Sequence, residues 1–255
     1  VAVSAIVVLV AAYRLVSRRA DLIRYAWMVV AGTLTQVVLG GITVLLDLHP
    51  VVVGVHFLLS MGLLAASEML WIASGTETGK PVSGISGSGQ PGLGRWLIRS
   101  QMVLATVVLF TGTIVTGTGP NSGDSRADRL DFELESVARI HAVTVWLLLA
   151  LLVVIALRLT GRLGGEASPG ARPSQGPRYK NPFDVVQWML GVVVLQGAIG
   201  YTQFALGVPP LLVELHIMGA VAVWSLAILL TAAPVGATVP VGETAGRNER
   251  LADLA

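Results

Sequence analysis

Three of the four histidines fall inside long apolar stretches of the chain. His56, His141 and His216 each stand about six residues inside the expected start of a helix. At 1.5 Å per residue, all three imidazoles lie about 9 Å from the helix end. Ionisable side chains at such depth in a membrane are costly and are usually functional, although an interhelical hydrogen bond is the structural alternative. His49 is different, because it falls in a turn where water would solvate it.

A pair of imidazoles on facing apolar helices suits heme iron better than zinc, which needs a third or fourth protein ligand. The chain has no cysteine, which excludes disulfides, thiolate catalysis and cysteine metal sites. We interpret four small residues as space for a flat macrocycle, with close helix packing as the alternative: Gly40, Gly41, Gly197 and Gly200. Arg139, two residues before His141, is predicted to pair with a heme propionate near the external surface.

The composition indicates what surrounds these histidines. The chain of 255 residues is 54% hydrophobic and only 13% charged, with a mean hydropathy of +0.75. Soluble domains carry about 25% charged residues, so most side chains here must face lipid. The sequence pI of about 9.3 comes from basic loops and does not indicate nucleic-acid binding.

The chain is predicted to be all-α, a polytopic transmembrane helix bundle, because a span needs about 20 apolar residues. Seven segments approach that length, at about 1–17, 22–46, 50–74, 94–117, 136–160, 182–206 and 209–233. One side of the predicted membrane carries fourteen Lys and Arg residues and the other only three. By the positive-inside rule the basic side is cytoplasmic, which places the C-terminus in the cytoplasm.

An internal repeat relates the two halves of the chain. The stretch from Gln36 through Pro50 to His56 matches that from Gln196 through Pro210 to His216 with no gap. Extending the match predicts two tandem four-helix repeats, related by a pseudo-two-fold axis along the membrane normal. The first repeat shows only three helices, so we expect an eighth helix and a histidine partner upstream of Val1.

The repeat also divides the chain. Residues 1–74 are expected to form the first-half repeat and 95–233 the second-half four-helix repeat. A Gly/Ser-rich cytoplasmic linker at 75–94 is expected to join them, and 234–255 is expected to be a disordered cytoplasmic tail.

The pattern resembles the heme A synthase family over nearly all of residues 1–233. The most specific piece is the run Val115-Thr-Gly-Thr-Gly-Pro-Asn-Ser-Gly-Asp124, which bulk hydrophobicity does not explain. Further matching pieces are the run that begins at Gln36 and leads to His56, His141 itself, and Gln196-Gly-Ala-Ile-Gly-Tyr leading to His216. Many relatives carry paired cysteines in the outer loops, and this chain departs from them in having none.

The resemblance implies an enzyme, an oxidoreductase that oxidises a methyl group of heme O to the formyl group of heme A for terminal oxidase biogenesis. His141 and His216 would be the axial pair of a resident heme b, and His56 would bind the substrate heme O. The essential acidic residue would lie upstream of Val1. The implied setting is the bacterial inner (cell) membrane, with heme O synthase, an electron donor and further copies of the chain as partners.

Two other functions fit part of the pattern. A bis-histidine membrane cytochrome would transfer electrons without catalysis, although such proteins often stack hemes at both membrane faces. A transporter would share the repeat and the number of spans, but it predicts broken helices and no iron.

Overall fold

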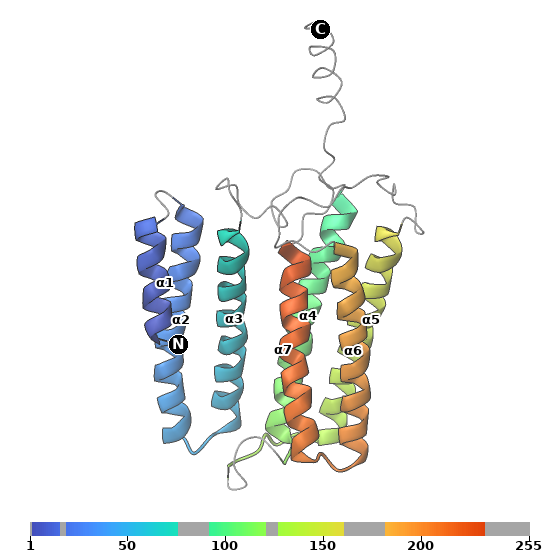
Figure 1. The fold of residues 1–255 in the computed structure, drawn as a ribbon. Helices are drawn as coiled ribbons and strands as arrows, with labels where there is room; N and C mark the ends of the chain where they lie inside the picture. Colours follow the sequence, from blue (N-terminus) through green and yellow to red (C-terminus); the bar gives the residue numbers. More distant parts are fainter. Residues whose placement is uncertain (1, 16–18, 76–91, 121–126, 161–181, 233–255) are drawn as a thin grey trace, which may run out of the picture.

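The computed structural model describes residues 2–15, 19–75, 92–120, 127–160 and 182–232. Within them the chain is helical and has no strand (Figure 1). The helices are α1 (Ala2–Leu15), α2 (Ala20–Leu45), α3 (Pro50–Ser74), α4 (Gly92–Thr118), α5 (Leu134–Leu159), α6 (Pro182–Ala205) and α7 (Pro210–Ala232). The predicted linker and tail fall outside these residues, except for 75 and 92–94.

The all-α prediction is confirmed, and each helix begins and ends within two residues of its predicted segment. Six of the helices, α2 to α7, are long and apolar enough to cross a membrane. The described part of α1 has 14 residues, about 21 Å along the helix axis, so its assignment as a further span stays a prediction. The described part of the chain thus has the character of a multi-pass membrane protein.

Helices α2 and α3, and likewise α6 and α7, are joined by tight turns with the same backbone geometry. Both turns place two successive residues at positive φ, which are Asp47 (49°) and Leu48 (60°) in one and Gly207 (74°) and Val208 (62°) in the other. In each turn the amide of the second residue donates to a carbonyl five residues earlier, at 2.9 and 2.7 Å. This bond closes the end of a helix, and the proline two residues later starts the next one.

Helices α4 to α7 form a closed four-helix bundle, in which each helix packs against its two neighbours and α4 packs against α7. Helix α3 packs against α4 and α7, α2 against α3, and α1 against α2, so the first three helices extend the bundle to one side (Figure 1). The buried indole of Trp224 on α7 donates to the Met61 carbonyl on α3 at 2.8 Å. This hydrogen bond links the two parts of the molecule.

The ends of α2 and α3 far from the tight turn are joined by Arg19. Its guanidinium pairs with the Asp21 carboxylate at 2.7 Å and also donates to the Ala73 carbonyl at 2.9 Å. The hydrogen bond to Asp21 raises the pKa of Arg19. The pair therefore ties the start of α2 to the end of α3.

The bundle has a close-packed apolar core in one half of its length and a cavity in the other half. Buried apolar side chains fill the half far from the tight turns, among them Ile98, Leu152, Met189, Ile228 and Leu230. The half near the turns instead encloses a cavity lined by all five helices from α3 to α7. Trp224 belongs to the buried core and also lines the cavity, so its ring lies at the boundary between the two.

Candidate functional site

The cavity in the turn-side half of the bundle has a volume of about 840 Å³. That volume is within the range of about 300–1,000 Å³ typical of small-molecule and cofactor sites. Its walls are mostly apolar, and its titratable lining residues are Glu135, Arg139, His141, Tyr201 and His216. An apolar cavity with a few polar groups pointing into it is the usual form of a ligand site.

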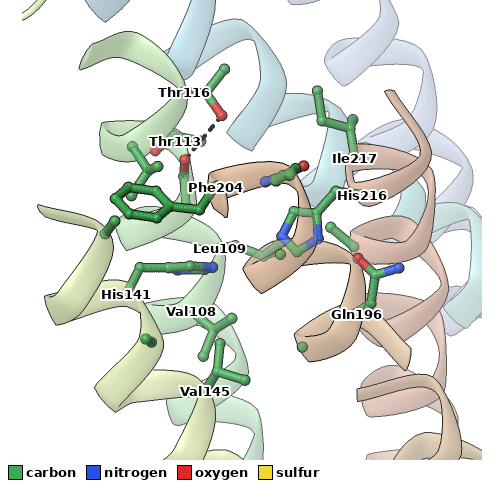
Figure 2. A pocket seen from close by; sticks show the side chains of 18 of the residues that line it. Val108, Leu109, Thr113, Thr116, His141, Val145, Gln196, Phe204, His216 and Ile217 are labelled. Carbon is green, nitrogen blue, oxygen red and sulfur yellow. Dashed lines mark hydrogen bonds between the residues drawn. The ribbon is translucent and has the colours of Figure 1, made fainter. Parts of the chain in front are cut away.

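His141 on α5 and His216 on α7 face each other across this cavity (Figure 2). Their ring centroids are 6.4 Å apart, and the ring planes are inclined at 79°. A metal ion held about 2 Å from one nitrogen of each imidazole would place the centroids roughly 6 Å apart. The structure therefore brings together the two histidines that the family resemblance pairs, at a separation that one iron atom could span.

No third ligand joins this pair among the described residues, where no group of three His, Cys, Asp or Glu side chains is placed to hold a metal ion. Heme iron takes four ligands from the porphyrin and at most two from protein, whereas zinc takes three or four from protein. The donor set therefore fits heme iron better than zinc.

Each of the two imidazoles rests against a glycine of a neighbouring helix. A Cβ atom at Gly112 on α4 would lie 3.2 Å from Cε1 of His141, and one at Gly200 on α6 would lie 3.3 Å from Cε1 of His216. Such contacts are tighter than side chains normally make, so glycine is what lets the rings lie this close to the helix backbone. We call Gly112 and Gly200 the imidazole seats.

The imidazole seats add to the sequence interpretation. Gly200 was expected to clear space for a macrocycle, and it both lines the cavity and faces a histidine ring. Gly40 on α2 faces His56, at 3.6 Å. Gly197 does line the cavity and has no neighbour within 4 Å of a Cβ, whereas Gly41 has open space around it and does not line the cavity.

His56 lies on α3 and does not line the cavity. Its Nδ1 atom is buried without a hydrogen-bond partner. The Gln36 amide donates to the His56 carbonyl at 3.1 Å and to the Ser60 hydroxyl at 2.6 Å, which holds α2 against α3 at this level. His49 directly precedes α3 in the tight turn and is partly buried.

Arg139 lines the cavity, as the propionate prediction requires, but it forms an ion pair with Glu135 one turn earlier on α5. Both side chains are largely exposed, so water screens this pair and its contribution to stability is small. The guanidinium can therefore exchange Glu135 for another carboxylate without a large loss of energy. Its role toward a propionate stays a prediction.

Gln196 is another cavity-lining residue, and its side chain packs directly on Gly219 of α7. A Cβ at position 219 would overlap the Gln196 amide, so the amide fits only because α7 has a glycine there. The amide oxygen is buried without a partner, which is consistent with a polar group available to a ligand.

Sequence reasoning did not identify Gly112 or its neighbour Thr111, whose hydroxyl lies 3.0 Å from Nδ1 of His141. The sequence carries no local signal for these contacts, because both residues precede His141 by about thirty residues and lie on another helix. No protein-family model, no curated protein and no solved structure matches the chain.

Proposed function

We propose that the chain is a heme-binding membrane oxidoreductase of the heme A synthase type, with His141 and His216 as the axial ligands of a b-type heme. One observation carries the proposal: two imidazoles from different helices face each other across an apolar cavity, 6.4 Å apart. Such a pair in an apolar membrane protein is a typical arrangement for heme iron.

The residues around the pair fit a tetrapyrrole. The cavity is large and mainly apolar, and Gly197 leaves part of its wall without a side chain. Arg139 at the turn-side end of α5 would pair with a propionate, and Gln196 offers an unpartnered amide oxygen. The chain thus supplies axial ligands, apolar walls and a cation, which are the protein's share of a heme site.

The proposed reaction is the oxidation of the methyl group of heme O to the formyl group of heme A, for which iron supplies the redox chemistry. In this proposal the His141 and His216 site is not where the methyl group reacts, because two protein ligands leave the iron no open position. His56 would bind heme O in the first half, where Gln36 fixes the backbone of α3 at the position of that histidine.

The proposal includes the repeat. Helices α2–α3 would correspond to α6–α7, and α1 to α5, within an architecture of two four-helix halves. Its support is local: the two tight turns share positive-φ residues and hydrogen bonds at positions 160 residues apart. A glycine on the helix before the turn also faces the histidine on the helix after it in both cases.

The proposed setting is the bacterial cell membrane, with the tight turns outside and the C-terminus in the cytoplasm. The charge distribution of the sequence supports this orientation, because its basic residues concentrate on the opposite side from the turns. The cavity would then open near the external surface, with membrane lipid around the bundle.

A second candidate is an electron-transfer cytochrome without catalysis of its own. The observation that favours it is the same facing pair, since iron with two protein ligands is suited to transferring electrons rather than to binding oxygen. Only the first function converts heme O to heme A, so one experiment distinguishes the two.

The test is to express the complete protein, with any residues encoded upstream of Val1, in cells that also make heme O, to purify it and to extract the hemes. We expect a Soret band from the purified protein and heme A in the extract. A Soret band with heme O and heme b alone would favour the electron-transfer cytochrome. A purified protein without a Soret band under heme-replete expression would contradict both.

Substitution of Gly219 by alanine tests the role of the cavity wall. The new methyl group would displace the Gln196 amide into the cavity, and we expect heme b to bind roughly tenfold more weakly, or about 1.4 kcal/mol. Titration of the apoprotein with heme b, followed at the Soret band, measures this. The double variant Gly219→Ala with Gln196→Ala should regain affinity, and an unchanged affinity in Gly219→Ala would contradict the expectation.

A further inference from the structure

Thr111 on α4 is the only side chain for which the structure shows a hydrogen bond to the imidazole of His141 within the described residues. Its hydroxyl oxygen lies 3.0 Å from Nδ1 of His141, and it also lies 3.0 Å and 3.1 Å from the carbonyl oxygens of Val107 and Val108. A threonine hydroxyl carries one proton, and in a helix it normally donates that proton to a carbonyl of the preceding turn. The oxygen of Thr111 is then left to accept from Nδ1–H.

The consequence for His141 concerns its tautomer. A neutral imidazole that donates from Nδ1 carries its lone pair on Nε2, which is the form that binds a metal through Nε2. Thr144, on the same helix as His141, lies beside this contact, with its hydroxyl oxygen 3.2 Å from that of Thr111. Its hydroxyl donates its proton to the His141 carbonyl at 2.7 Å, so that proton is not directed at the Thr111 oxygen.

The other threonines of α4 behave differently. The hydroxyls of Thr106, Thr113, Thr116 and Thr118 bond to carbonyls of their own helix. Thr111 does not line the cavity, so it has no direct contact with whatever binds there. It can therefore act on a ligand only through His141.

A backbone carbonyl interacts with each ring, that of Val108 with His141 and that of Gln196 with His216. The hydroxyl contact is particular to His141, because Nδ1 of His216 is buried and makes no hydrogen bond of normal geometry. The two imidazoles of the facing pair thus differ in whether a threonine hydroxyl lies within hydrogen-bond distance of Nδ1.

We propose that Thr111 is a positioning residue that fixes His141 in its Nδ1–H form and presents Nε2 to the iron, which makes His141 the firmer axial ligand and His216 the exchangeable one. This proposal rests on the proposed function for the identity of the metal. The tautomer of His141 does not depend on that identity, and it can be measured without heme.

The experiment compares Thr111→Val with Thr111→Ser and with the control Thr106→Val, all in the full chain. Valine keeps the shape of threonine but cannot accept a hydrogen bond, serine keeps the hydroxyl, and Thr106 is an exposed threonine of the same helix that does not reach the ring. Loss of such an outer-shell hydrogen bond typically weakens metal binding 10–100-fold. We expect that loss of heme b affinity for Thr111→Val only.

Two further readouts separate positioning from a merely structural role. In ¹⁵N NMR of the heme-free protein labelled at histidine, His141 should be the Nδ1–H form, and Thr111→Val should shift it toward a mixture. In the reduced His216→Ala variant, titrated with enough heme b to overcome its weakened binding so that His141 is the one imidazole ligand, the iron–histidine stretching band should move to lower frequency when Thr111→Val is added, because the hydrogen bond makes the ligand more basic.

Carbon monoxide tests the exchangeable ligand. In the reduced wild type it should displace His216 and leave His141 bound, and Thr111→Val should remove that preference. Unchanged heme affinity and an unchanged stretching band in Thr111→Val would overturn the proposal. A wild type without a Soret band would overturn the proposed function and the ligand assignments, whereas an Nε2–H tautomer of His141 would overturn the positioning role itself.

Discussion

Alanine at position 141 or at position 216 is expected to abolish the Soret band of the purified protein. Each substitution removes one of the two imidazoles that face each other across the cavity, and an apolar cavity of this kind offers the iron no replacement ligand. We expect heme b affinity to fall by at least about 100-fold, which corresponds to roughly 3 kcal/mol. Titration of each apoprotein with heme b provides the measurement.

His49→Ala is the matched control for these two variants. His49 stands in the tight turn before α3 and does not line the cavity, so its loss should leave the spectrum and the affinity unchanged. Equal effects of all three substitutions would show that the spectrum reports the integrity of the fold rather than ligation. Retention of the wild-type spectrum in His141→Ala and His216→Ala would rule out the facing pair as the site.

Valine at Gly200 is expected to disturb the ligation of heme although both histidines remain in the chain. A Cβ there already lies 3.3 Å from the His216 ring, and the two methyl groups beyond it would occupy the space of the imidazole. The ring must then swing away from His141, so we expect the six-coordinate spectrum to be lost and heme b affinity to fall at least tenfold. Absorption and magnetic circular dichroism spectra of the loaded protein would show the change in ligation.

Gly191→Val on the same helix is the control for the imidazole seat. A Cβ at Gly191 meets nothing within 4 Å and the residue is exposed, so the two variants share the cost of valine in place of glycine but not the contact with histidine. The expectation fails if the two variants bind heme b equally well. Gly112→Val should behave like Gly200→Val, through His141.

The helices could be predicted from the sequence because lipid imposes a simple requirement on length and polarity. Spans such as α3 and α7 begin with a proline after a tight turn, which marks their start to within a residue. For α1 the sequence likewise predicted the helix, and its assignment as a span stays a prediction.

Equal depth predicted that His56, His141 and His216 share one layer, and the family resemblance paired His141 with His216, but their surroundings could not be predicted. Depth comes from counting residues along a helix, whereas the neighbours of a ring depend on how adjacent helices are rotated about their axes. Nothing in a single sequence specifies the rotation of α4 against α5. Gly112 and Thr111, which contact His141, were therefore invisible until the helices were placed together.

The tight turn between α6 and α7 acts as a spacer for the site. One residue inserted between Leu206 and Pro209 would disrupt the hydrogen bond from the Val208 amide to the Gln203 carbonyl and change the position of α7 relative to α6. His216 would then lose its contact with Gly200, although neither residue had changed. The length of this turn, with its costly positive-φ valine, thus sets the alignment of the histidine with the glycine that it faces.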